Sequence, residues 1–445
     1  MKFTKNVKSG VYEFQSLPEK LLLKGGTVID PSQNLEKRTD ILIEDGKITA
    51  VEEINESHFS GVVMDVDGKI VSPGWMDLHV HLREPGREDE ETIESGTLAA
   101  ANGGFTAVCC MPNTNPPIDS QEIIQYIKDR ARDSLVEVYP IATITKKRAG
   151  DELAEILDLV EQGAVAISDD GSPVMSAEIM RRALEYSKMV NIPVIGHEED
   201  ITMTADGHIH EGFVSTCLGL GGIPSVAEDI MIARDIMLAE YTGGRFHVAH
   251  ISTRKSVELV REAKKRGVQV TAEVTPHHFT LTDEAVRGYD TNAKMKPPLR
   301  TADDIEAIME GLQDNTIDAI ATDHAPHSWE EKASEFIYAP FGIVGLETAL
   351  GLSMTKLVHS KKLSLSQLIE KFSTNPYRIL GLEPPSIQKG MNANITVFDP
   401  EITWTFDEKQ SLSRSHNSPF IGWKLTGKPH LVINRGKLFS SILAS

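Results

Sequence analysis

Histidine and aspartate side chains recur directly after short apolar runs in the central part of the chain. The residues placed in this way are His79, His81, Asp169, Asp170, His197, His250 and Asp323. Imidazole and carboxylate groups are ligands of zinc and similar divalent cations, and a catalytic ion keeps one position open for water. Four histidines and at least two carboxylates exceed the three protein ligands of a typical catalytic zinc. We therefore expect one or two zinc ions per chain, and a carboxylate that bridges two ions is an attractive arrangement.

The apolar runs that precede these residues favour strands, and helical segments separate them. The expected strands cover residues 70–78, 105–110, 136–144, 164–168, 192–196, 246–249, 268–274 and 317–322. Near-continuously apolar strands that alternate with helices predict a parallel sheet buried on both faces, and eight units predict a TIM-type (β/α)8 barrel. An open doubly wound sheet is the alternative, but the glycine-rich loop that usually follows its first strand is missing.

Turn and cap residues indicate where several of the barrel helices begin and end. Asp119 and Glu122 have capping-box spacing ahead of a helix expected over 123–131. Glycine or asparagine follows the other expected helices, which cover 151–162, 177–190 and 256–266.

A barrel makes the positions of the histidines and aspartates meaningful. All of them follow the carboxyl ends of strands, the rim where barrel enzymes keep their active sites. The His79-x-His81 spacing places both imidazoles on one face, because side chains along a strand repeat every two residues. One such histidine alone is more often a structural residue, and an Asp-Asp-Gly triplet is more often a turn. Their coincidence at five strand ends favours metal ligation.

Both ends of the chain favour strands and turns instead. Short apolar runs lie within 21–51, where Glu44-Asp45-Gly46 is a hairpin signal, and again at 394–398 and 430–434. Each end is too short to bury a core alone. We expect residues 1–70 and 385–445 to form a composite β-sandwich domain beside a catalytic barrel over 71–384.

Composition excludes several functional classes. The formal net charge of −20 argues against a general nucleic-acid or acidic-membrane binder, since both need basic surface. No apolar run is long enough for a membrane span, and residues 1–20 lack the apolar core of a signal peptide. Three cysteines, Cys109, Cys110 and Cys217, do not make a disulfide framework, so a reducing cytoplasm is the expected location.

Several motifs carry a family resemblance. Residues 73–86, PGWMDLHVHLREPG, resemble the first-strand signature of the amidohydrolase superfamily, and the HVHLREPG part is similar to dihydroorotases of the bacterial metal-dependent type. Residues 111–114, 168–171, 322–327 and 339–342 resemble further dihydroorotase blocks in the same order. The resemblance covers roughly residues 20–440, nearly the whole chain.

The resemblance implies a division of the metal ligands. His79, His81 and Asp323 would hold one ion, His197 and His250 would hold a second, and Asp170 would bridge them. Asp169 remains a competing bridge. Many relatives bridge with a carbamylated lysine, but the run 164–168 contains none.

The resemblance also implies a reaction, the reversible cyclisation of N-carbamoyl-L-aspartate to dihydroorotate in de novo pyrimidine (UMP) biosynthesis. In ring opening, a metal-bound hydroxide would attack the cyclic amide. Asp323 would act first as general base toward the attacking water and then as general acid toward the amide nitrogen.

A carboxylate substrate needs a local cation in so acidic a protein. Arg83 lies two residues beyond His81, and its guanidinium can bind a carboxylate with two hydrogen bonds. The other expected substrate contacts are His81, Asn113, His327, Phe341 and Gly342. Lys296 stands where the family often has asparagine, so it either contacts substrate through a different donor or makes no contact.

Two other readings remain open. A sister cyclic amidohydrolase, such as an allantoinase or hydantoinase, would need the same metals but not the same carboxylate clamp. A non-catalytic scaffold relative would typically have lost ligands, whereas all six are present. As partners we expect the small-molecule substrate and further copies of the chain in a dimer or larger homo-oligomer, but no nucleic acid or membrane.

Overall fold

Eight parallel strands form one sheet that curls into a barrel in the computed structural model, which describes residues 13–444. The strands are β9 (Trp75–Val80), β10 (Phe105–Cys110), β11 (Glu137–Ala142), β12 (Ala166–Ser168), β13 (Val194–Gly196), β16 (Phe246–Val248), β17 (Val270–Val274) and β18 (Ala319–Ile320). They pair in chain order. The segment after β18 returns to β9 through a parallel bridge between Val80 and His324, and the amide of His81 donates to the carbonyl of His324 at 2.9 Å. The predicted (β/α)8 barrel is confirmed.

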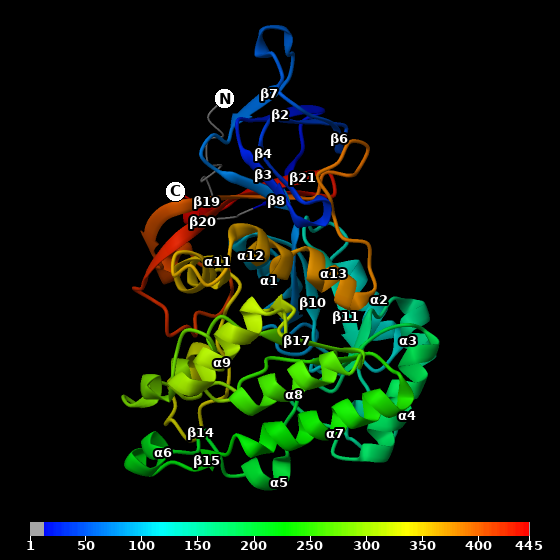
Figure 1. The fold of residues 1–445 in the computed structure, drawn as a ribbon, viewed down its shortest axis with the longest axis vertical. Coiled ribbons are helices and arrows are strands. Elements are labelled where there is room, and N and C mark those ends of the chain that lie inside the picture. Colours follow the sequence, from blue (N-terminus) through cyan, green and yellow to red (C-terminus); the bar gives the residue numbers. More distant parts are fainter. Residues whose placement is uncertain (1–12, 445) are drawn as a thin grey trace.

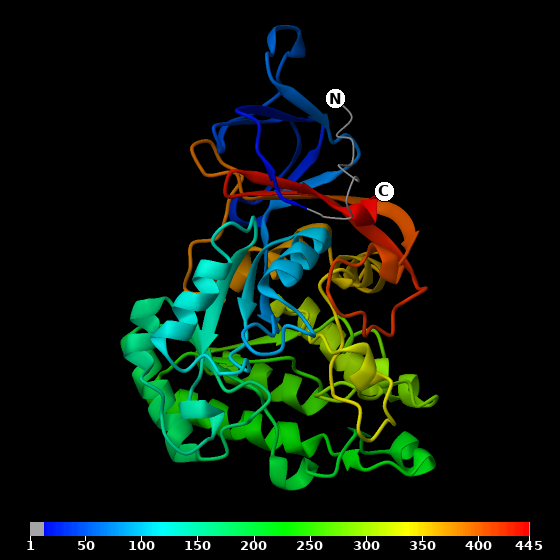
Figure 2. The ribbon, with the colours of Figure 1, turned by 180° about the vertical axis from the view of Figure 1, so that it is seen from behind.

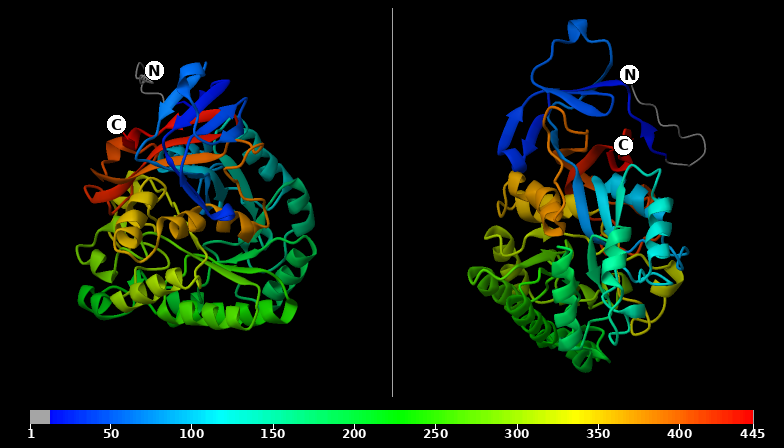
Figure 3. Two further views of the ribbon diagram at one scale, coloured as in Figure 1. Left: turned by 45° about the horizontal axis from the view of Figure 1, so that its top comes forward. Right: turned by 90° about the vertical axis from the view of Figure 1, so that its right-hand side faces the viewer.

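Helices cover the outside of the barrel (Figures 1 and 3). The longer ones are α1 (Ile93–Gly103), α2 (Gln121–Arg130), α3 (Ile156–Gln162), α4 (Ala177–Met189), α7 (Val226–Thr242), α8 (Arg254–Lys265), α9 (Ala302–Gln313), α12 (Leu365–Phe372) and α13 (Thr374–Leu380). Their buried faces are apolar. In α8, for example, Val257, Val260 and Ala263 are buried at the spacing expected of an amphipathic helix.

Two helix starts differ from prediction. Helix α2 has Ser120 as its N-cap, and the predicted capping box fails because a carboxylate oxygen of Asp119 accepts the amide of Lys147 at 2.9 Å. Helix α3 begins at Ile156 rather than at residue 151. The preceding segment pairs back onto the chain after β11, through a bridge between Thr145 and Leu153 and a 2.9 Å bond from the amide of Ala154 to the carbonyl of Ile144.

The two chain ends form the strands at one end of the molecule, as Figure 2 also shows. A seven-stranded sheet has the order β1-β21-β20-β19-β8-β3-β4, and a four-stranded sheet has the order β6-β5-β2-β7. The N-terminal strands are β1 (Gln15–Ser16), β2 (Lys20–Lys24), β3 (Thr27–Asp30), β4 (Leu35–Arg38), β5 (Ile41–Glu44), β6 (Lys47–Val51), β7 (Val62–Asp65) and β8 (Ile70–Pro73). The C-terminal strands are β19 (Ile395–Thr405), β20 (Lys424–Asn434) and β21 (Lys437–Ser440).

The apolar faces of these two sheets share one core. Leu21, Leu23 and Ile43 from the four-stranded sheet and Ile395 and Ile433 from the seven-stranded sheet belong to the same buried cluster. Asp45 and Gly46 take positive φ values of 49° and 76° in the β5–β6 hairpin, as their turn signal predicts. The exact domain boundaries at 70/71 and 384/385 stay a prediction. Residues 1–12 of the expected composite domain lie outside the described residues. They also make up most of the segment 1–20, for which we expect no signal peptide.

A long connection follows β13 and contains α5 (Ile201–Thr204), β14 (Ile209–His210), α6 (Phe213–Leu218) and β15 (Gly222–Ile223). In Figure 1 these pieces lie far from the terminal sheets. Among residues 13–444, no helix combines the length and apolar character that crossing a bilayer requires.

Candidate metal centre

The six predicted ligands meet inside the barrel, brought there by the ends of five strands or by the residues just beyond them. His79 lies on β9 and His81 directly follows it, while Asp170, His197, His250 and Asp323 follow β12, β13, β16 and β18. All six are buried, with exposed fractions between 0% and 7%. Ligand-type atoms come within 4.8 Å of one another in three overlapping groups: His79, His81 and Asp170; His79, His250 and Asp323; and Asp170, His197 and His250.

Asp170 occupies the middle of this arrangement. Its Oδ1 lies 3.3 Å from His79 Nε2, 3.4 Å from His197 Nδ1 and 3.6 Å from His250 Nε2. Its Oδ2 lies 3.6 Å from His81 Nε2. One carboxylate therefore faces all four imidazoles, which is the position that a bridging ligand needs.

Asp169, the competing bridge, faces elsewhere. One of its oxygens accepts the amides of Ile144 and Thr145 at 2.8 and 3.1 Å, and the other accepts the Thr145 hydroxyl. These bonds connect the loop after β12 to the loop after β11 and use both carboxylate oxygens of Asp169. Because Asp170 faces the imidazoles and Asp169 does not, the geometry favours Asp170 as the bridge.

Asp323 and His250 hold unusual backbone conformations. Their φ values are 46° and 32°, in the left-handed region that L-residues avoid at a cost of about 1–3 kcal/mol each. The surrounding bonds impose this geometry on Asp323. Thr322 donates its amide to Asp77 at 3.0 Å, and Asp323 Oδ1 lies 3.0 Å from His81 Nε2.

The charges at the centre show what it attracts. Burial raises the pKa of Asp170, but the charge of His79 and the nearby rings of His197 and His250 hold it well below its ordinary value. Burial lowers the pKa of His79, yet Asp170 and Asp323 raise it well above its ordinary value. The buried carboxylates are therefore stabilised by nearby positive charge. Protonated imidazoles or metal cations can supply that charge.

Unsatisfied polar atoms support the same reading. Among the described residues, His79 Nε2 and Asp170 Oδ1 have no hydrogen-bond partner although both are buried. Such atoms are rare and costly in folded proteins unless an ion or water satisfies them. The donor set of imidazole nitrogens and carboxylate oxygens, with these two atoms facing one another, fits a transition-metal cation such as zinc.

Two glutamates that the sequence analysis missed contact ligand histidines from outside the centre. Glu273 Oε1 lies 2.8 Å from His79 Nδ1, and Glu199 Oε2 lies 3.3 Å from His197 Nε2. Glu199 follows His197 by two residues, the same spacing as His79 and His81, so the sequence offered a signal for it. Glu273 lies on β17, which only β18 separates from β9 around the closed barrel, but it is 194 residues from His79 in the chain, so no local pattern connects the two.

The predicted substrate residues form a second group next to the ligands. The Asn113 Oδ1 lies 2.8 Å from His81 Nδ1, which leaves the Asn113 amide nitrogen as a donor. Arg83 Nη2 lies 3.3 Å from His327 Nε2, and Arg83 Nε lies 3.1 Å from Glu90 Oε2. His327 is not a solvated loop side chain, because its Nδ1 lies 2.7 Å from Glu90 Oε1. Arg83, Asn113 and His327 therefore border the metal ligands.

Phe341, Gly342 and Lys296 make protein contacts of their own. The Phe341 carbonyl lies 2.8 Å from His327 Nε2, and the Gly342 amide donates to the Lys294 carbonyl at 2.9 Å. Gly342 has φ of 156°, and a Cβ there would lie 2.6 Å from the His327 ring, so only glycine fits. Lys296 Nζ lies 2.8 Å from Glu199 Oε1, which ties it to the Glu199–His197 pair.

Comparisons with known proteins agree with this geometry. A family model described as "Dihydro-orotase-like" matches residues 68–256. The chain is 54% identical over 420 residues to a protein named dihydroorotase from Pelotomaculum thermopropionicum, covering 94% of this chain and 98% of that one. Dihydroorotase from Geobacter sp. strain M21 is 52% identical over 419 residues, again covering 94% and 98%.

The fold also resembles solved structures. L-hydantoinase (dihydropyrimidinase) from Arthrobacter aurescens matches with a TM-score of 0.84 and 25% identity, covering 94% of this chain and 96% of that one. A D-hydantoinase structure, at 22% identity and a TM-score of 0.82, supports the fold alone.

Zinc should stabilise the folded chain, because the unfolded chain does not hold the six ligands together. At free zinc about 100 times the dissociation constant, the gain is about 2.7 kcal/mol in the free energy of unfolding. Thermal unfolding with zinc and with a chelator measures this as a shift in Tm. His250→Asn should shrink the shift, whereas His359→Asn, at an exposed position, should keep it. An unchanged shift in His250→Asn would contradict the ligand set.

Proposed function

The chain belongs to the dihydroorotase family, and from this premise we propose the part that each residue of the site plays in the reaction. Dihydroorotase interconverts N-carbamoyl-L-aspartate and dihydroorotate by closing or opening a cyclic amide, within de novo pyrimidine (UMP) biosynthesis. The observation that carries the assignment is identity of 54% across 94% of the chain with a curated dihydroorotase, against 25% with the L-hydantoinase.

We propose zinc as the metal, with one or two ions per chain. His79, His81 and Asp323 would hold one ion, His197 and His250 would hold the other, and Asp170 would bridge them. The central place of Asp170 among the four imidazoles supports this division. Bound there, a divalent cation would lower the pKa of a water molecule and polarise the amide carbonyl.

Asp323 is the proposed proton carrier. An amide nitrogen is a poor leaving group and must receive a proton as the ring opens. Asp323 is buried, and its contact with His81 Nε2 at 3.0 Å holds the carboxylate toward the centre of the site. It takes a proton from the attacking water and delivers it to the nitrogen, and it reverses both transfers when the ring closes.

Arg83 is the proposed carboxylate clamp. Its side chain is 11% exposed, and burial lowers the pKa of the guanidinium although the Glu90 carboxylate raises it. The guanidinium would attract a carboxylate of the substrate, with the Asn113 amide nitrogen as a neighbouring donor and the His327 ring beside it. The backbone at Phe341 and Gly342 closes this side of the site through the His327 contact. Lys296 acts on His197 through Glu199 and is a weaker candidate for substrate contact.

We also propose that the enzyme works in the cytoplasm on small molecules alone. All three cysteines are free in the structure, and Cys109 and Cys110 are buried. This is in keeping with a reducing compartment.

A homo-oligomer is the proposed assembly, with the outer face of α4 and α7 as the surface between copies. The face consists of Tyr186, Met189, Ile230, Met237 and Tyr241, whose exposed fractions run from 43% to 75%. The two helices are joined where Lys188 Nζ donates to the Thr242 carbonyl at 2.9 Å. The same stretch of α4 carries Glu178, Arg181, Arg182 and Glu185, whose charges pair with one another along the helix.

Arg83→Ala should raise KM for N-carbamoyl-L-aspartate by about 10–100-fold, because a charged hydrogen-bond pair contributes about 1.5–3 kcal/mol. Steady-state kinetics measures the change, and metal analysis should show unchanged zinc content. Arg132→Ala removes an exposed guanidinium (69% of the side chain) and should leave KM as it is. An unchanged KM in Arg83→Ala would contradict the proposed role of Arg83 in binding the substrate carboxylate and would favour a hydantoinase-type substrate.

Asp323→Asn should lower kcat by about 10²–10⁴-fold at saturating zinc, because the amide cannot shuttle the proton. The measurement is turnover in both directions, with zinc content determined on the same samples. Asp314→Asn, which alters a surface pair with Arg261, is the control. Retained activity in a zinc-loaded Asp323→Asn enzyme would assign the proton transfer to another group.

Met237→Glu should reduce the molar mass in solution toward that of one chain, since it places a charge in the middle of the proposed interface. Light scattering after size-exclusion chromatography gives the mass. Ile402→Glu, at a position of 42% exposure on β19, is the matched control. Equal masses for wild type and Met237→Glu would place the interface elsewhere.

A further inference from the structure

A column of four polar side chains runs through the barrel interior, away from the substrate side of the site. His79 Nδ1 lies 2.8 Å from Glu273 Oε1, and Glu273 Oε2 lies 3.2 Å from His247 Nε2. His247 Nδ1 in turn lies 2.8 Å from Thr271 Oγ1. The column joins β9, β17 and β16, and the side chains of His79, Glu273 and His247 have exposed fractions of at most 1%.

The surroundings make this column an exception. Apolar side chains fill much of the barrel interior, among them Met76, Leu78, Ile141 and Ile195. A TIM-type barrel normally packs such layers throughout. A buried carboxylate costs several kcal/mol in desolvation, and a well-packed apolar side chain is often at least as stable at such a position. Stability alone therefore gives no reason for Glu273 to be charged here.

Hydrogen-bond chemistry gives the column one direction. A carboxylate only accepts, so the Nδ1 of His79 must carry a proton, which leaves Nε2 as the nitrogen available to a metal cation. His247 Nε2 lies 3.2 Å from the second oxygen of Glu273, an ion-pair contact without hydrogen-bond alignment. Its Nδ1 is held at Thr271 Oγ1. Glu273 therefore fixes the tautomer of His79, and the ring of His247 packs beside the carboxylate of Glu273.

We propose that Glu273 and His247 are positioning residues for His79, held in place from the other end of the barrel by Thr271. They keep His79 in the tautomer whose Nε2 can bind a metal cation, and they fix the plane of its ring. This inference rests on the proposed metal ligation by His79. Partners of this kind commonly change metal affinity or activity by about 10–100-fold when they are removed.

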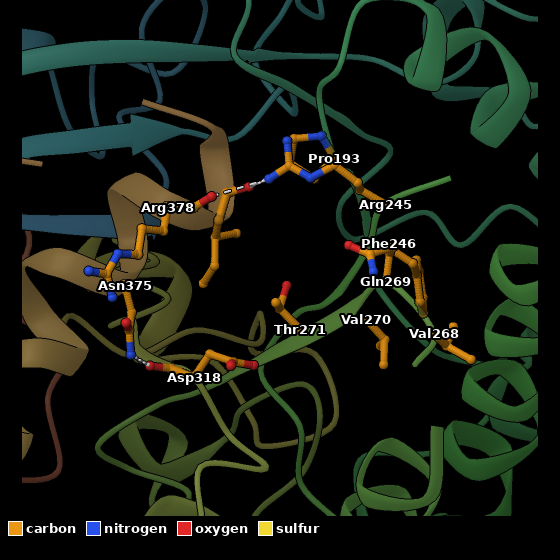
Figure 4. Close-up of a pocket in the computed structure, with 11 residues that line it drawn as sticks. Pro193, Arg245, Phe246, Val268, Gln269, Val270, Thr271, Asp318, Asn375 and Arg378 are labelled. Atoms are coloured by element: carbon orange, nitrogen blue, oxygen red, sulfur yellow. Dashed lines mark hydrogen bonds between the residues drawn. The ribbon is translucent and has the colours of Figure 1, made fainter. Parts of the chain in front are cut away.

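The far end of the column lies at a cavity of about 320 Å³ (Figure 4). Its lining comes from the amino ends of strands, including Pro193 before β13, Arg245 before β16 and Asp318 before β18. Thr271 is labelled among the side chains that face this space. The column thus ends near solvent on the side opposite the metal centre, and a change at Thr271 touches neither the ligands nor the substrate residues.

Zinc affinity of the full chain tests the inference, measured by competition with a chromophoric chelator. Glu273→Gln should weaken zinc binding by about 10–100-fold, and Thr271→Val should weaken it by a smaller factor in the same direction. The cobalt-substituted protein should show an altered visible absorption spectrum in Glu273→Gln, because the orientation of a ligand ring has changed. At saturating zinc, kcat should largely recover and KM should stay unchanged.

Glu347→Gln is the matched control. Glu347 is also a buried glutamate, with 5% of its surface exposed, and lies outside the site. It accepts the side-chain amide of Asn102 at 2.6 Å and the backbone amide of Leu412 at 2.7 Å. Its substitution should leave zinc affinity and the cobalt spectrum unchanged, whatever it does to Tm. His79→Asn supplies the reference for a lost ligand.

The outcomes distinguish a failure of this inference from a failure of the proposed function. Wild-type zinc affinity and an unaltered cobalt spectrum in a folded Glu273→Gln chain would overturn the inference while leaving the proposed function intact. A wild-type chain that binds no zinc would overturn the proposed function and this inference with it. Where Glu273→Gln does not fold, Thr271→Val decides: weakened zinc binding supports the column, and unchanged binding overturns it.

Discussion

Closure of the barrel is the constraint on which the site depends. The segment after β18 reaches β9 through the Val80–His324 bridge, and Asp77 accepts amides from both sides of that seam, from His79 at 3.1 Å and from Thr322 at 3.0 Å. These contacts place His81 beside Asp323, which follows it by 242 residues in the chain. An open sheet of the same strands would keep its first and last strands apart, and the ligand set would fall into two halves.

Electrostatics then accounts for the selection of residues within the closed barrel. A chain of net charge −20 gathers buried carboxylates at one point and surrounds them with imidazoles rather than with lysine or arginine. Neutral imidazole keeps a lone pair for a metal, whereas ammonium and guanidinium groups would fill the same space with fixed charge. The guanidinium of Arg83 stands to one side, where it is held by the Glu90 carboxylate and borders the space left for an anionic substrate.

Much of this arrangement was open to prediction from sequence because its signals are local. Strand ends, the His79-x-His81 spacing and the position of Asp323 on the last strand each depend on neighbouring residues only, and the structure brings all of them together. The misplaced features depend on contacts between distant segments. Asp119 accepts the amide of Lys147 instead of capping a helix, and Glu273 contacts His79 from a position 194 residues away in the chain. The choice between Asp169 and Asp170 is of the same kind, since only the paths of two loops decide which carboxylate turns inward.

The shared sheet of the two chain ends has a consequence for synthesis on the ribosome. Strand β8 pairs with β19, so that Pro73 faces Ile395, and β8 leads within two residues into the first barrel strand. The barrel can therefore begin to assemble before β8 has its partner β19, which lies more than 300 residues downstream. Until that partner emerges, β8 exposes unpaired backbone and apolar surface. The nascent chain thus exposes an unpaired strand edge at β8, which is prone to aggregation, for most of its translation. Pairing with β19, one of the last strands to be synthesised, covers that edge.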